Sequence, residues 1–177
     1  MPIITLTTDF GTKDHFVGAV KGAIYSELPN AKIVDITHQI SPFNITETAY
    51  ILKNSYKSFP DGTIHIIGVD SELSSTNKHI ALALDNHYFV CPDNGLICMI
   101  TKDIKPTKVV EINIHDRIES SFPVLDVFVQ VACFISRGGN LTVIGKETKS
   151  YKEMTEIQPK VSQDQKIITG GVIYIDN

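Results

Sequence analysis

Three acidic residues could do chemistry because each lies at or near the end of an expected strand. Asp9 follows the β-prone run 3–8, Asp14 lies five residues later across a turn, and Asp70 follows the apolar run 63–69. Asp9 and Asp14 could accept hydrogen bonds from a vicinal diol or bind a cation. Asp9 could instead be structural, and Asp14 could simply cap a helix. Phosphate is disfavoured, since the turn carries one glycine and two acids would repel an anion.

Hydrophobic periodicity predicts the elements that position these acids. We expect strands over 3–8, 32–36, 63–69, 108–114 and 171–176, a hairpin of 80–84 with 87–91, and helices over 14–24, 45–57, 96–101 and 124–136. This alternation predicts an α/β fold, a three-layer sandwich with a largely parallel central sheet flanked by helices. Residues 1–177 should form one domain, with 146–166 a polar linker or loop before the last strand. If the strands before Asp9 and Asp70 are neighbours, both acids share one rim and one small ligand could touch both.

Composition excludes several classes of function. The formal net charge is −4 and no run of Lys or Arg occurs, so nucleic acid is not an expected partner. No apolar stretch approaches the roughly 18 residues that cross a membrane, and no export signal pattern opens the sequence. We therefore expect a cytoplasmic protein without a membrane partner. The three cysteines and six histidines show no metal-ligand spacing, so we expect no metal site.

Five phrases, in order along the chain, read TLTTDFGTKDHFVGAVKGAI, IVDITHQISPFNI, FPDGTIHIIGVD, YFVCPDNGL and GGVIYIDN. Together they resemble the S-adenosylmethionine (SAM) hydroxide adenosyltransferase family, which also contains the SAM-dependent fluorinase and chlorinase. The resemblance implies attack of water or hydroxide on the ribose C5′ of SAM, releasing adenosine and L-methionine without a metal or organic cofactor. It also implies a homotrimer with SAM bound between the N-terminal domain of one chain and the C-terminal domain of the next.

The resemblance assigns roles to individual residues. Asp9 matches the acid that holds the ribose hydroxyls, Asp14 matches a second acid of the same pocket, and Phe43 matches an apolar or aromatic position against the ligand. Asp70 matches the acid of an Asp-Arg-His set that orients water. The further positions expected to bind ligand are His15, Phe16, Phe122, Val124 and Asp176.

Two members of the water-orienting set are replaced in this sequence. Asn77 stands at the arginine position, with Lys78 beside it, and Pro123 stands at the histidine position. Proline offers no side-chain donor or acceptor and asparagine carries no charge. Lys78 could supply a positive charge, or it could be an ordinary surface lysine. The expected catalytic residues are therefore Asp70, Asn77 and Lys78.

Two hypotheses stay open. The first is a SAM hydrolase, and the second is a catalytically impaired SAM- or adenosine-binding protein on the same scaffold. Val124 replaces the small or hydroxyl-bearing residue associated with a halide pocket, which favours hydrolysis over halogenation. In the family, the phrase that Asp176 begins leads into a β-barrel domain that grips adenine, and the sequence stops at Asn177. We therefore expect an N-terminal domain alone, with weak SAM binding.

Overall fold

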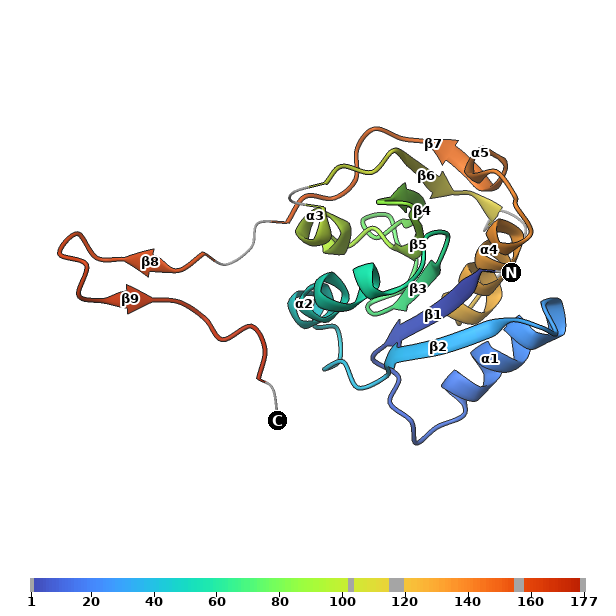
Figure 1. Cartoon of the computed structure of the whole chain (residues 1–177), viewed down its shortest axis with the longest axis horizontal. Coiled ribbons are helices and arrows are strands. Elements are labelled where there is room, and N and C mark those ends of the chain that lie inside the picture. Colours follow the sequence, from blue (N-terminus) through green and yellow to red (C-terminus); the bar gives the residue numbers. More distant parts are fainter. Residues whose placement is uncertain (1, 102–103, 115–119, 155–157, 176–177) are drawn as a thin grey trace.

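A seven-stranded mixed sheet forms the centre of the computed structural model, which describes residues 2–101, 104–114, 120–154 and 158–175 (Figure 1). Its order is β2-β1-β3-β5-β4-β6-β7. The strands are β1 (Ile3–Thr8), β2 (Lys32–Thr37), β3 (Ile64–Gly68), β4 (His79–Leu84), β5 (His87–Pro92), β6 (Lys108–Ile112) and β7 (Gly145–Glu147). Strands β2, β1, β3 and β5 pair in parallel, whereas β4, β6 and β7 join through antiparallel pairings.

Helices cover both faces of this sheet, so the expected α/β fold with a largely parallel sheet is confirmed. On one face α1 (Phe16–Glu27), α4 (Val129–Ser136) and α5 (Leu141–Ile144) pack on residues such as Ile4, Leu6 and Ile66. On the other face lie α2 (Ile45–Ser55) and α3 (Leu96–Ile100), which pack on Ile67, Leu82 and Phe89. Helix α2 contributes Ala49 and Leu52 to this core. Strands β4 and β5 alternate their apolar side chains between the two cores, which explains why their sequences are apolar almost throughout.

Two helical elements differ in detail from the expected ones. The helix expected over 124–136 begins with a π-helical turn, η3 (Val124–Phe128), and becomes α-helical only at Val129. Such turns are rare and occur frequently at functional sites. A 3₁₀ turn, η1 (Tyr56–Ser58), extends α2. The expected β4–β5 hairpin is present, and Asp85 and Asn86 both have positive φ, as a type I′ turn requires.

The expectation of a closing strand over 171–176 is wrong for the described part of that range. Residues 171–175 have no regular structure, and Asp176 lies outside the described residues. Within the expected linker over 146–166, residues 146–147 belong to β7, and β8 (Lys160–Val161) pairs with β9 (Ile168–Thr169) just beyond it. We call residues 158–175 the arm. A strand needs a hydrogen-bonding neighbour, and β-prone residues alone do not supply one.

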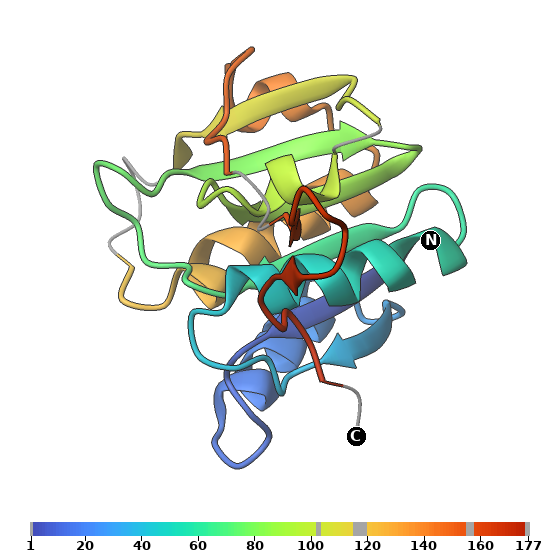
Figure 2. The same ribbon diagram turned by 90° about the vertical axis from the view of Figure 1, so that its left-hand side faces the viewer.

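The arm projects from the sheet and then turns back toward α2 (Figure 1). Viewed from that side, it passes in front of α2 (Figure 2). Tyr174 stacks on Tyr50 of α2, with ring centroids 4.7 Å apart. Most of the other apolar side chains of the arm are exposed to solvent, and that of Val172 has an exposed fraction of 81%. This contact joins the arm to the outer face of α2, away from the rim described next.

Candidate functional site

The carboxyl ends of β1 and β3 bring Asp9 and Asp70 to the same rim. The two strands are parallel neighbours, and Thr8 lies opposite Gly68 in their register. Each acid therefore follows its strand by one or two residues, as expected. Burial raises the pKa of Asp9, and the nearby Asp70 carboxylate raises it further, against the lowering effect of backbone N–H groups from Phe43, Asp9 and Asp70. The strand register and the effect of Asp70 on the pKa of Asp9 agree in placing the two acids near each other.

The loop after β2 forms a second wall of this rim. The Phe43 backbone N–H donates to Asp9 Oδ2 at 3.0 Å, while the Phe43 side chain is 68% exposed. Phe43 has φ +61° and Asp70 has φ +50°, conformations that cost non-glycine residues on the order of 1 kcal/mol or more. Asn44 then caps α2, its side chain accepting from the Glu47 N–H at 3.0 Å. Two residues with strained backbone, Phe43 and Asp70, therefore lie near Asp9. Residues strained in this way occur frequently at ligand-binding sites.

Asn77 closes the loop that follows Asp70. Its Nδ2 donates to the carbonyl oxygens of Asp70 at 2.8 Å and Glu72 at 3.0 Å, and its Oδ1 is buried without a hydrogen-bond partner. The Lys78 side chain is exposed, and its carbonyl accepts from the Asp93 N–H at 2.6 Å. The amide at the expected arginine position thus holds the backbone of Asp70. The predicted catalytic roles of Asn77 and Lys78 stay predictions.

An aromatic cluster lies beside the rim and includes a residue that the sequence reasoning missed. Phe10, directly after Asp9, lies 5.9 Å from Phe16 and 5.3 Å from Phe122 between ring centroids. Phe16 and Phe122 are 5.3 Å apart, and His15 stacks on Phe16 at 4.5 Å. The structure therefore brings together three of the expected ligand-binding residues. The only sequence signal for Phe10 was its position directly after Asp9.

Other predicted residues lie apart from the carboxyl pair. Val124 is fully buried, and a Cβ added to Gly68 would lie 2.7 Å from its Cγ2, so Val124 packs on the end of β3. Asp14 is exposed and does not cap α1, whose N-cap is His15 without a side-chain hydrogen bond. The capping interpretation is therefore wrong, because the helix begins two residues after Asp14. Asp176 lies outside the described residues.

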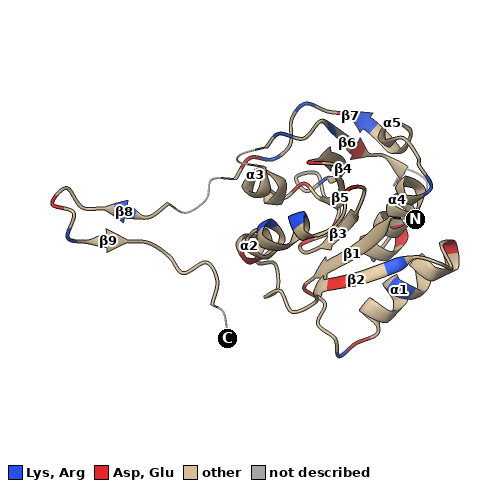
Figure 3. Cartoon of the chain, in the orientation of Figure 1, with Lys and Arg blue, Asp and Glu red and all other residues tan. Residues whose placement is uncertain are grey.

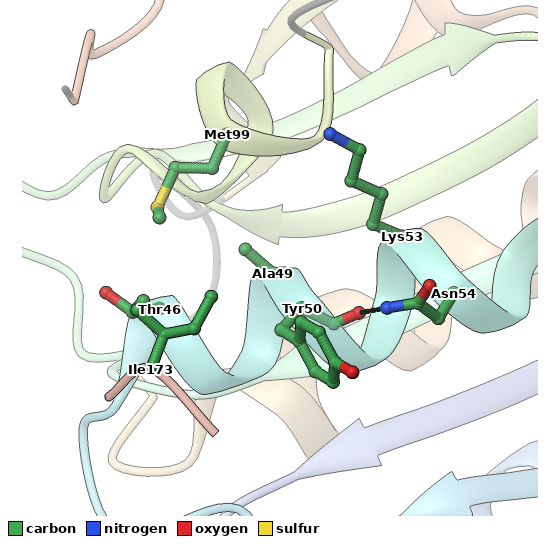
Figure 4. Close-up of a pocket in the computed structure, with 7 residues that line it drawn as sticks. All are labelled: Thr46, Ala49, Tyr50, Lys53, Asn54, Met99 and Ile173. Carbon is green, nitrogen blue, oxygen red and sulfur yellow. Dashed lines mark hydrogen bonds between the residues drawn. The ribbon is translucent and has the colours of Figure 1, made fainter. Parts of the chain in front are cut away.

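A separate cavity of about 290 Å³ lies between α2, α3 and the arm (Figure 4). It is lined by Thr46, Ala49, Tyr50, Lys53, Asn54, Met99 and Ile173. In Figure 4 the Asn54 amide turns back onto its own helix and donates to the Tyr50 carbonyl at 2.8 Å. This lining contains no carboxylate, the charged acceptor that the expected diol contact uses. The rim of Asp9 and Asp70 is the better candidate site.

Four further features concern metal ligands, membrane-spanning helices, basic residues and cysteines. Among the described residues, no group of three or more His, Cys, Asp or Glu side chains could hold a metal ion. Within the same ranges, no helix has both the length and the apolar character needed to cross a bilayer. Lys and Arg are spread over several elements and do not gather on one of them (Figure 3). The three cysteines are free.

Known proteins are similar to this chain over most of its length. Residues 4–145 match the family described as SAM hydroxide adenosyltransferase N-terminal domain. The chain is 37% identical to (R)-S-adenosyl-L-methionine hydrolase of Methanocaldococcus jannaschii over 142 residues, covering 76% of this chain and 53% of the relative. It is 28% identical to the protein of the same name from Salinispora arenicola over 181 residues, covering 99% of this chain and 69% of that relative.

The fold also matches solved structures. A crystal structure of an uncharacterized conserved protein from Thermotoga maritima superposes with a TM-score of 0.83 at 30% identity, covering 92% of this chain and 64% of that one. The chain spans about half the length of its M. jannaschii relative. Its match to the family extends from β1 to the start of β7 and includes every element that forms the rim. The chain therefore belongs to the SAM hydroxide adenosyltransferase family.

Proposed function

We propose that the protein hydrolyses SAM to adenosine and L-methionine by attack of water or hydroxide on the ribose C5′. The observation that carries this proposal is the meeting of Asp9 and Asp70 at the carboxyl ends of β1 and β3. One carboxylate can hold a sugar while its neighbour faces the nucleophile. The relatives named (R)-S-adenosyl-L-methionine hydrolase support the same substrate and reaction.

The chemistry asks little of the protein beyond positioning. A C5′–O bond forms as the C5′–S bond breaks, its electron pair neutralises the sulfonium, and the attacking water loses a proton to solvent. The sulfonium is already an activated leaving group, so rate depends on alignment and on removal of competing water. In this proposal Asp9 accepts hydrogen bonds from the ribose 2′- and 3′-hydroxyls, and Asp70 orients the attacking water. The reaction requires no metal or organic cofactor.

The second candidate is an adenosine- or SAM-binding protein with impaired catalysis. A specific observation favours it: both donors of Asn77 are spent on the carbonyls of Asp70 and Glu72, so this residue has none left for water. Pro123, at the N-cap of η3, has no side-chain donor to offer. Under this alternative the rim still binds the nucleoside, but turnover falls toward the uncatalysed rate.

One experiment separates the candidates. The protein is incubated with each sulfonium epimer of SAM, adenosine is quantified by chromatography, and adenosine binding is measured by calorimetry. Hydrolysis predicts adenosine above the uncatalysed background, and loss of binding in Asp9→Asn. Binding without adenosine release would support the second candidate. A protein that shows no adenosine binding and no adenosine release would contradict both candidates. Formation of 5′-halo-adenosine in chloride or fluoride would point to halogenation.

The assembly and location are part of the same proposal. We propose a homotrimer that completes each SAM site across a subunit interface, as the family resemblance implies. A cytoplasmic location suits an enzyme whose substrate is an intracellular metabolite. Light scattering coupled to size-exclusion chromatography tests the assembly. A mass of one protomer at the concentrations that give turnover would contradict it.

A further inference from the structure

His38, the first residue after β2, is tied to the turn that carries Asp9. It is 5% exposed, and its Nδ1 lies 2.8 Å from Oγ1 of Thr8, the residue directly before Asp9. Its carbonyl oxygen accepts the Gly11 N–H at 2.7 Å. The ring and backbone of His38 therefore contact the chain on both sides of Asp9.

The second ring nitrogen of His38 lies beside an acid but does not form a hydrogen bond with it. Its Nε2 lies 3.1 Å from Asp35 Oδ1, and Asp35 Oδ2 also accepts from Lys21 of α1 at 2.5 Å. Burial would raise the pKa of Asp35, but its hydrogen bond with Lys21 and the nearby His38 hold it below its usual value. A carboxylate this close to Nε2 favours hydrogen rather than a lone pair on that nitrogen through its charge, although Nε2 is buried without a hydrogen-bond partner. Nδ1 is then the acceptor, and the Thr8 hydroxyl donates to it.

This orientation leaves Thr8 Oγ1 with lone pairs facing the turn. The Phe10 N–H lies 3.4 Å from it, on the other side of Asp9. The hydroxyl, imidazole and carboxylate follow the order of a nucleophilic triad, but Thr8 is only 1% exposed, so no substrate can reach its oxygen. The arrangement can hold backbone in place but cannot attack a ligand.

The same loop reaches Asp9 from its other end. The Phe43 N–H donates to Asp9 Oδ2, five residues after His38. Rotation of the Asp9 turn would break the contacts of Thr8 and Gly11 with His38 as well as the contact with Phe43. Fixing a side chain through the residues around it is how supporting groups orient those that touch the ligand.

We infer that His38 is a positioning residue that orients Asp9 toward the ribose diol through Thr8, with Asp35 setting its tautomer. This inference rests on the proposed function, because it assumes that Asp9 binds the sugar. His38 itself does not touch the ligand.

A matched control exists on the same strand. Thr5 Oγ1 lies 2.7 Å from His65 Nδ1, a second buried Thr–His pair three residues earlier on β1 and farther from the rim. Thr8→Val and Thr5→Val remove the same hydroxyl from similar environments. They should lower the unfolding free energy by similar amounts, about 1 kcal/mol each. Only one of them lies next to Asp9.

The test measures adenosine affinity by calorimetry and SAM kinetics by chromatography. We expect Thr8→Val to weaken adenosine binding about tenfold and to raise KM more than it lowers kcat, because a diol contact is made in both ground and transition states. Thr5→Val should leave both quantities unchanged. His38→Asn keeps an acceptor near the position of Nδ1 and should recover most of the affinity that His38→Ala loses.

The outcomes separate the two proposals. Equal affinities for Thr8→Val, Thr5→Val and the unmodified protein would overturn the positioning role and leave the proposed function standing. Failure of His38→Asn to bind better than His38→Ala would also overturn it, and this pair serves if Thr8→Val does not fold. An unmodified protein that binds neither adenosine nor SAM would overturn the proposed function and the inference with it.

Discussion

Two aspartates with nearly the same backbone conformation lie at opposite ends of the strands. Asp70, after β3, has φ +50°, and Asp85, between β4 and β5, has φ +51°. Asp85 occupies a two-residue hairpin turn that requires this conformation, and its carboxylate has partners: Tyr56 Oη at 3.3 Å and Lys57 Nζ at 3.7 Å. Asp70 occupies a longer loop, where Asn77 holds its carbonyl and a like charge, Asp9, is nearby.

The difference teaches how to separate structural strain from functional strain. At Asp85 the local turn explains the conformation and the partners satisfy the charge, so nothing calls for a ligand. At Asp70 no tight turn demands the conformation, and the neighbouring charge disfavours a second carboxylate. Asp85 has side-chain partners for its carboxylate, whereas Asp70 has a second acid nearby. A bound substrate would supply the partners that the rim of Asp9 and Asp70 needs.

The largest predicted effect tests this contrast directly. Asp70→Asn should reduce the rate of adenosine formation about 100-fold, because an amide orients the attacking water less strongly than a carboxylate and misplacement of a reactant can cost this much. Asp85→Asn, the matched control at the other end, should stay within about twofold. Initial rates by chromatography measure both. Similar losses in the two variants would erase the distinction between the ends.

The second prediction concerns the stability of the end that carries Asp85. Burial and the neighbouring His87 lower the pKa of His65 to about 3, and burial also lowers that of His87. Below about pH 6.5, His65 binds a proton in the unfolded chain but not in the folded protein. The contribution of His65 to the unfolding free energy is therefore largest above that pH and falls as the pH falls.

Each pH unit between about 6.5 and 4 should cost about 1.4 kcal/mol for His65 alone. Urea unfolding from pH 8 to pH 4.5 measures the slope. His65→Gln should flatten it, and Asp70→Asn should leave it unchanged. A slope identical in His65→Gln and the unmodified protein would show that acid sensitivity arises elsewhere.

A third, smaller effect follows from backbone strain. Asp70→Gly should raise the unfolding free energy by about 0.5 to 1 kcal/mol, because glycine adopts positive φ without steric cost, while turnover is lost. Asp85→Gly should give no net gain, since it also removes the acceptor of the Tyr56 hydroxyl. Chemical denaturation measures both. A stability loss in Asp70→Gly would mean that its carboxylate contributes to folding.

The smallest prediction concerns the ion pair of Asp85. Lys57 lies 3.7 Å from that carboxylate and is 59% exposed, so Lys57→Met should change the unfolding free energy by less than about 0.5 kcal/mol. The change should shrink further in high salt. A loss above about 1.5 kcal/mol would show that the turn depends on this charge pair more than on its conformation.

The sequence predicted the rim because strand ends can be recognised locally. Asp9 and Asp70 each follow an apolar run, and parallel pairing then places them together. The Phe43 N–H could not be foreseen, because every residue but proline has this donor and only the folded loop aims it. The wrong prediction for Asp14 has a similar cause, since it depended on the residue at which α1 begins and the pattern locates helix ends only to within a few residues.

Residues 171–175 show a different limit. Val172 and Ile173 have strand-forming side chains, yet pairing depends on a neighbour that a local pattern cannot identify. The sequence reasoning missed His38 for a different reason. Its role depends on Thr8, which lies on the neighbouring strand β1 and far away in sequence, although Asp35 is only three residues earlier.

The tight fit at Gly68 has a consequence for redesign. A methyl group there would meet Val124 Cγ2 at 2.7 Å and the Phe10 ring at 3.1 Å, so alanine would push both outward. Enlarging Gly68 would therefore disturb the apolar packing at the end of β3 without altering any polar group. Val124→Ala should remove the side chain that a larger residue at position 68 would meet, so combining the two substitutions offers a way to alter this packing while Asp9 and Asp70 are unchanged.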